Sequence, residues 1–148
     1  MRKTIAFDMD GTFVNLYGVE GWLEMIINKE TTPYEIAKPL YNMNDFNTMV
    51  ETLKANGYRV VIISWTAKGN NKEYNKKIRQ AKVRWLKNYN VNVDEIHIVK
   101  YGTPKSYLVK GNAILVDDEE ANRKNWIRGN TIDATKNILK EIKKVLDI

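Results

Sequence analysis

The feature that most constrains this chain is the apolar run in residues 58–64, YRVVIIS. Its four consecutive β-branched residues, VVII, leave no alternate polar position for a solvated face. A strand of this kind is buried on both faces, as in a parallel sheet covered by helices on both sides. The segment AILV at 113–116 repeats the pattern. Both segments therefore predict an α/β fold with a parallel sheet.

Weaker patterns fill in the rest of that fold. Short apolar segments predict three further strands, at 3–8, 95–99 and 130–132. Apolar stripes and end signals predict three helices, over 46–56, 72–89 and 134–146. Asn44 and Asp45 are suited to cap the first helix, and Gly57 is suited to end it. Because strands alternate with helices, we expect a single α/β domain.

The segment between the first strand and the first helix has a different character. Residues 13–43 are rich in aromatic side chains and include a short helical stripe at Trp22, Leu23, Met25 and Ile26. We interpret this segment as a small helical cap inserted into a core formed by 1–12 and 44–148. Its aromatic residues serve either for packing or for stacking on a ligand base.

The predicted helix over 72–89 has two unlike faces. An apolar stripe at spacings of three and four residues consists of Tyr74, Ile78, Ala81, Trp85 and Tyr89. The other faces carry basic residues, namely Lys72, Lys76, Lys77, Arg79, Lys82, Arg84 and Lys87. We expect this basic surface to be solvated, and a groove for nucleic acid is the alternative.

The composition limits the classes of function. Residues 1–66 contain 6 Lys/Arg and 8 Asp/Glu, whereas residues 67–148 contain 18 and 10. The basic second part favours an anionic partner, either a phosphorylated small molecule or nucleic acid. The chain has no cysteine, which excludes disulfides and thiolate chemistry. With no signal peptide and no apolar run near ~18 residues, we expect a cytoplasmic protein without a membrane partner.

Reactive side chains follow the predicted strands where each strand ends. Asp8 and Asp10 follow the first strand, Ser64 ends the second, and Asp117-Asp118 end the fourth. In open α/β sheets, ligands bind beyond these carboxyl ends. Adjacent carboxylates repel one another unless a cation lies between them, and Mg²⁺ prefers such oxygen ligands. One carboxylate can also act as nucleophile toward phosphorus and another as general acid and base.

Four stretches resemble the four motifs of the haloacid dehalogenase superfamily, in that family's order. They are FDMDGT at 7–12, Ser64 after VVII, a lysine before the strand at 113–116, and VDD at 116–118. The resemblance implies a Rossmann-like three-layer α/β sandwich and phosphatase chemistry. It assigns Asp8 as nucleophile and Asp10 as general acid and base, because a carboxylate two residues after the nucleophile marks the family's phosphatases.

The same resemblance implies the remaining roles. Ser64 would hold the phosphoryl group, with Thr66 as the alternative, and Lys105 would stabilise it, with Lys100 and Lys110 as competitors. Asp8, Asp117 and Asp118 would bind Mg²⁺ together with the backbone carbonyl of Asp10. We expect four residues beside these to contact the substrate, namely Gly11, Thr12, Trp65 and Thr66.

A weaker resemblance concerns the substrate. The stretch SWTAKGNNKEYNKKIRQAKVRWLKNY, followed by a lysine and ILVDD, is similar to small 5′(3′)-deoxyribonucleotidases. It implies hydrolysis of nucleoside monophosphates. The 3′-phosphatase domains of polynucleotide kinase-phosphatases have a similar layout, so a phosphorylated nucleic-acid end is an alternative substrate. A non-catalytic protein that binds a nucleotide or another protein is the third hypothesis, and the oligomeric state stays open.

Overall fold

A five-stranded parallel sheet forms the centre of the computed structural model, which describes residues 3–147. Its strands are β1 (Lys3–Phe7), β4 (Tyr58–Trp65), β5 (Glu95–Val99), β6 (Ala113–Asp117) and β7 (Thr131–Asp133). They pair in the order β5-β4-β1-β6-β7. Every end lies within one residue of its predicted position, so the α/β fold with a parallel sheet is confirmed.

Helices connect these strands and follow the last of them. They are α3 (Met43–Ala55), α4 (Lys72–Asn88), α5 (Glu120–Asn125) and α6 (Ile138–Leu146), with a 3₁₀ helix, η2 (Lys105–Leu108). Two helices begin elsewhere than predicted because other asparagines cap them. The side chain of Asn42 caps α3, and that of Asn137 caps α6. No helix within residues 3–147 is long and apolar enough to cross a membrane.

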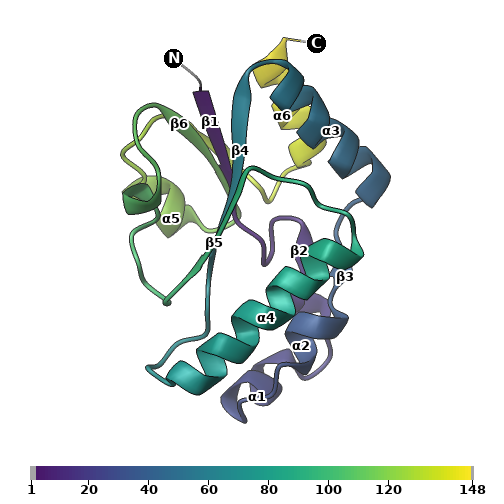
Figure 1. Ribbon diagram of the computed structural model, residues 1–148, viewed down its shortest axis with the longest axis vertical. Coiled ribbons are helices and arrows are strands. Elements are labelled where there is room, and N and C mark those ends of the chain that lie inside the picture. Colours follow the sequence, from purple (N-terminus) through teal and green to yellow (C-terminus); the bar gives the residue numbers. More distant parts are fainter. Residues whose placement is uncertain (1–2, 148) are drawn as a thin grey trace.

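Two apolar cores lie on opposite faces of the sheet, because successive strand side chains point to opposite sides. Ile5, Phe7 and Ile62 pack in one core with α3 and α6, and also with the end of α4. Ala6 and Val61 pack on the other face, with side chains next to η2 and α5. Figure 1 shows α3 and α6 on one side of the sheet and α5 on the other. The expected three layers are therefore present.

The segment 13–43 folds as five short elements between β1 and α3. They are β2 (Val14–Asn15), a 3₁₀ helix η1 (Leu16–Gly18), α1 (Trp22–Ile27), α2 (Thr32–Ile36) and β3 (Lys38–Pro39). Strands β2 and β3 pair with each other, and α2 packs on α4 through Tyr34, Tyr74 and Ile78. Figure 1 shows α1, α2 and α4 gathered beyond the carboxyl ends of β1 and β4.

Candidate active site

The central strand β1 ends between two neighbours that run on, β4 to Trp65 and β6 to Asp117. Phe7 is in register with Ile62 of β4 and with Val116 of β6, and the backbone N–H of Asp8 donates to the Val116 carbonyl at 2.9 Å. The residues that follow these strands therefore meet at one edge of the sheet. This edge is where an open α/β sheet binds ligands.

A tight turn follows Asp8 and depends on Gly11. Gly11 has φ +80°, and a Cβ at this position would collide with the Asp118 carboxylate. Thr12 is fully buried, and its Oγ1 lies 3.3 Å from Oδ2 of Asp8 and 3.2 Å from Oδ1 of Asp118. We expected Gly11 and Thr12 to contact substrate, and neither is among the described residues that line the cavity presented below, so this contact stays a prediction.

Lys105 is the lysine that reaches the carboxylates. It is only 6% exposed, and its Nζ lies 2.9 Å from Oδ1 of Asp8 and 2.8 Å from Oδ2 of Asp117. Burial opposes the charged form, but the two carboxylates outweigh it and raise the pKa of the Lys105 ammonium. Its competitors Lys100 and Lys110 are both exposed.

Three carboxylates form a group that suits a divalent cation. Asp8, Asp117 and Asp118 each offer one oxygen, and these oxygens all lie within 4.8 Å of one another. Burial, and to a smaller extent the charge of Asp8, raises the pKa of both Asp117 and Asp118. Holding all three carboxylates in the charged form without a cation is therefore unfavourable. An all-oxygen set of this kind fits Mg²⁺. The side chain of Asp10 does not belong to this group.

The Asp10 carboxylate pairs instead with a residue that the sequence analysis misassigned. We expected Lys82 on the solvated basic surface, and this expectation is wrong, because Lys82 is 1% exposed. Its Nζ donates to Oδ2 of Asp10 at 2.8 Å, to Oγ of Ser64 at 2.7 Å and to the Trp65 carbonyl at 2.8 Å. Its ammonium also lies 5.2 Å from the Tyr34 ring centroid.

The spacing of Lys82 carried a signal for this placement. It lies four residues after Ile78 and three before Trp85, and both of these residues are buried. A side chain at these spacings stands on the same helical face as the apolar stripe. The position therefore predicts burial, and a long lysine stem can bury its methylenes while its ammonium reaches a polar partner.

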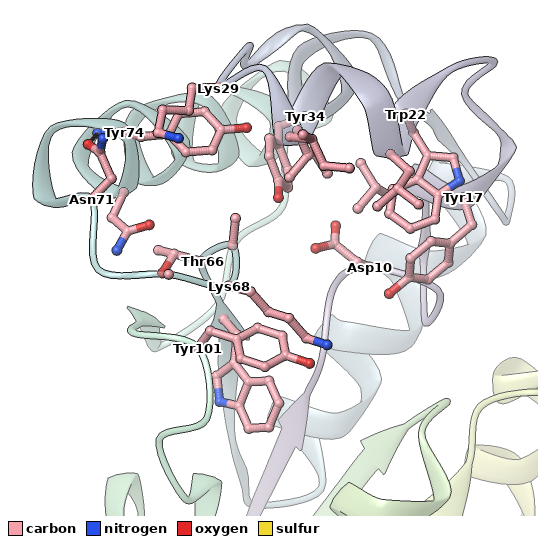
Figure 2. A pocket seen from close by; sticks show the side chains of 18 of the residues that line it. Asp10, Tyr17, Trp22, Lys29, Tyr34, Thr66, Lys68, Asn71, Tyr74 and Tyr101 are labelled. Atoms are coloured by element: carbon pink, nitrogen blue, oxygen red, sulfur yellow. Dashed lines mark hydrogen bonds between the residues drawn. The ribbon is translucent and has the colours of Figure 1, made fainter.

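A cavity of about 660 Å³ opens over these groups. Asp8, Asp10 and Lys105 line part of it. Figure 2 shows the Asp10 carboxylate pointing into the cavity, between Tyr17 and Trp22 on one side and Thr66 and Lys68 on the other. Six aromatic residues contribute to the wall, namely Tyr17, Trp22, Tyr34, Trp65, Tyr74 and Tyr101.

Trp65 and Thr66, both predicted to contact substrate, line this cavity. Trp65 packs at a tilt against Tyr101 with ring centroids 4.9 Å apart, and its Nε1 donates to the Thr103 carbonyl. Thr66 is 3% exposed, and its Oγ1 has no hydrogen-bond partner among residues 3–147. Ser64, rather than Thr66, is the hydroxyl bonded to Lys82, whereas Thr66 is the one of the two that lines the cavity.

The comparisons with known proteins concern the fold. No family model matches this chain, and no curated protein matches it. Among solved structures, the chain is similar to D,D-heptose 1,7-bisphosphate phosphatase from Burkholderia thailandensis, with a TM-score of 0.58 and 11% sequence identity. The match covers 99% of this chain and 100% of that one. A likeness at this identity shows a shared fold over the whole length.

Proposed function

We propose that this chain is a Mg²⁺-dependent phosphomonoesterase that works through an aspartyl-phosphate intermediate on nucleoside monophosphates. The observation that carries the proposal is the convergence of three strand-end carboxylates, two buried lysines and the buried Ser64 hydroxyl. Asp8 and Lys105 of this group, together with Asp10, line one cavity. The phosphatase activity named for the structurally similar protein supports the reaction class.

The first step is attack by the Asp8 carboxylate on the phosphorus atom. The new bond joins a carboxylate oxygen to phosphorus, and the bond from phosphorus to the ester oxygen breaks. Lys105, held against Asp8 at 2.9 Å, is placed to neutralise negative charge on the phosphoryl oxygens. A bound Mg²⁺, held by Asp8, Asp117, Asp118 and the Asp10 carbonyl, would supply further neutralisation of the phosphoryl charge.

Asp10 is placed to move the protons in both steps. As an acid it protonates the departing ester oxygen, and as a base it then takes a proton from the water that hydrolyses the aspartyl phosphate. Burial raises the pKa of Asp10 against the opposing effect of Lys82, which favours a carboxyl group that can carry a proton. Lys82 fixes the position of this carboxyl and of the Ser64 hydroxyl through its hydrogen bonds.

The walls of the cavity support a nucleoside as the leaving group. A volume of about 660 Å³ lies within the range of roughly 300–1,000 Å³ that is typical of small-molecule sites. Burial raises the pKa of Tyr17 and Tyr34, so both phenols remain neutral. Neutral aromatic rings offer faces for stacking on a planar base.

The test is release of phosphate from a panel of nucleoside 5′- and 3′-monophosphates and sugar phosphates, with Mg²⁺ and with EDTA. We expect release that requires Mg²⁺ and that is fastest with one class of nucleotide. Faster turnover of sugar phosphates would retain the reaction and refute the nucleotide substrate. No release from any ester would refute the enzyme and favour a protein that only binds a nucleotide or another protein.

The variant Asp8→Asn tests the intermediate. It keeps the shape of the side chain and removes the nucleophile, so we expect hydrolysis to fall by about 10³-fold or more. Brief incubation of the wild-type protein with a radiolabelled phosphate ester should give an acid-stable label that hydroxylamine removes. A label that persists in Asp8→Asn would place the nucleophile elsewhere.

A further inference from the structure

A second cavity of about 710 Å³ adjoins the active-site cavity. We call it the basic groove, and it is lined by Asn70, Lys72, Asn75, Lys76, Arg79 and Lys100. Asn70 and Asn75 line both cavities. A ligand that extends out of the active site past these two residues therefore enters the basic groove.

The groove collects positive charge that the protein does not neutralise. No ion pair within residues 3–147 joins Lys72, Lys76, Arg79 or Lys100 to an acidic side chain. Arg79 is nevertheless held in place, because its Nε donates to the Ile98 carbonyl at 2.8 Å. Four cations without acidic partners along one groove favour an anionic ligand.

The spacing of these cations favours an extended ligand. Lys72, Lys76 and Arg79 lie on α4 at intervals of four and three residues, so they form a line along one face of the helix. At a rise of ~1.5 Å per residue, this line is about 10 Å long. A single phosphate group is too small to contact all of it, whereas a chain of phosphodiesters can follow it.

The wall of the active-site cavity offers a stacking surface. Tyr101 is 40% exposed and packs against Trp65, and the ammonium of Lys68 lies 5.5 Å from the Tyr101 ring centroid. Figure 2 shows the end of Lys68 beside the Tyr101 ring at the edge of the active-site cavity. An exposed aromatic ring next to a positively charged groove is the combination that binds single-stranded nucleic acid without reading its sequence.

We propose that the nucleotide this site prefers is the phosphorylated end of a single-stranded nucleic acid rather than a free nucleoside monophosphate. This proposal rests on the proposed phosphatase function and narrows its substrate. The terminal phosphate lies at Asp8, a base near the end stacks on Tyr101, and the following phosphodiesters run along the basic groove. The groove thus explains why the basic residues of α4 are concentrated beside the active site.

The first experiment compares turnover of two substrates. These are a hexadeoxythymidylate with one terminal phosphate, prepared as the 5′ and as the 3′ form, and the matching thymidine monophosphates. We expect the oligomer of one polarity to have the higher kcat/KM. The variant Lys72→Gln/Lys76→Gln should lower the ratio of kcat/KM for the oligomer to kcat/KM for the mononucleotide by about tenfold.

The matched control is Lys77→Gln/Lys87→Gln, which removes the same charge from exposed positions of α4 that line neither cavity. We expect it to leave the ratio of kcat/KM values unchanged. The proposal is overturned if both double variants lower the ratio equally, or if the oligomer is hydrolysed no faster than the mononucleotide.

The second experiment measures binding without turnover, so it separates failure of the groove from failure of the phosphatase. Fluorescence anisotropy follows a labelled hexadeoxythymidylate that lacks terminal phosphates, at several salt concentrations. The slope of log Kobs against log salt should become shallower by about 1.4 in Lys72→Gln/Lys76→Gln, that is about 0.7 per cation, and should not change in the control. Equal slopes in wild type and the groove variant overturn the proposal even if mononucleotides are hydrolysed.

Discussion

Lys82 and Asp10 form a buried ion pair across the active site, with Nζ 2.8 Å from Oδ2 and side-chain exposures of 2% and 17%. The pair joins α4 to the turn after β1. The same ammonium also binds the hydroxyl of Ser64 at the end of β4. One lysine therefore sets the relative positions of groups from three parts of the chain.

We predict that Lys82→Met slows the first chemical step more for poor leaving groups than for good ones. Without Lys82, the Asp10 carboxyl is no longer held in position to protonate the ester oxygen of the substrate. Protonation of this oxygen accelerates the reaction most when the leaving group is an alcohol, because an alkoxide is a poor leaving group. Single-turnover release should fall by about 10²-fold for an alkyl phosphate and much less for p-nitrophenyl phosphate.

The same variant should lower the free energy of unfolding by about 3 kcal/mol, because it leaves a largely buried carboxylate without its partner. The control is Lys87→Met, which removes an exposed charge from the same helix. Equal losses of rate on the two esters would contradict a role for Lys82 in positioning Asp10.

Lys82 also shows where prediction from the sequence succeeded and where it stopped. Asp8, Ser64 and Asp117 could be brought together from the sequence, because each lies at the carboxyl end of a parallel strand and these strands are neighbours in the sheet. Lys82 lies in the middle of a helix with six other basic residues. Composition alone therefore suggested a solvated face, whereas its spacing from Ile78 and Trp85 indicated the opposite.

The segment 13–43 was predictable only in outline. Its aromatic content indicated a packed insert, but β2 and β3 have two residues each, and α2 has five. Elements this short lack a full period of apolar alternation, so local pattern cannot define them. Similarly, Asn42, Asn44 and Asp45 are all residue types that cap helices well. Only the structure shows that the side chain of Asn42 is the cap, because it accepts hydrogen bonds from the backbone N–H groups of the two others.

We predict that the metal-free protein loses stability as the pH rises from about 4 to about 8. Burial and the facing Asp8 and Asp117 carboxylates raise the pKa of Asp118 from 3.8 to about 8. Between pH 3.8 and about 8, the Asp118 carboxyl keeps its proton in the folded protein and has lost it in the unfolded chain. The stability that this proton contributes is therefore fully present below the unfolded pKa of 3.8 and is lost as the pH rises through the folded pKa of about 8.

The measurement is denaturant unfolding across this pH range in EDTA. Asp118→Asn should flatten the fall in stability, because a neutral amide no longer titrates beside Asp8. Added Mg²⁺ should restore stability to the wild-type protein at pH 8, where the carboxylates are charged and free to bind it. A wild-type profile that coincides with that of Asp118→Asn would contradict the prediction.

We predict that Gly11→Ala damages the site and that Gly57→Ala does not. Both glycines have positive φ, +80° and +85°, so alanine is strained at both by about 1–2 kcal/mol. At Gly11 the new methyl group also collides with the Asp118 carboxylate, whereas no atom of residues 3–147 lies within 4 Å of a methyl group at Gly57. Thermal unfolding should register both substitutions, and phosphate release should fall at least tenfold only in Gly11→Ala. Equal activity of the two variants would show that Asp118 can move without consequence.

We predict that Thr66→Val stabilises the protein. The buried Oγ1 of Thr66 has no partner among residues 3–147, so replacing it with a methyl group removes a desolvation cost of about 1 kcal/mol, which denaturant unfolding measures. Thr12→Val is the contrasting control, because Oγ1 of Thr12 contacts Asp8 and Asp118, and its loss should lower stability. A Thr66→Val variant that is less stable than the wild type would contradict the prediction.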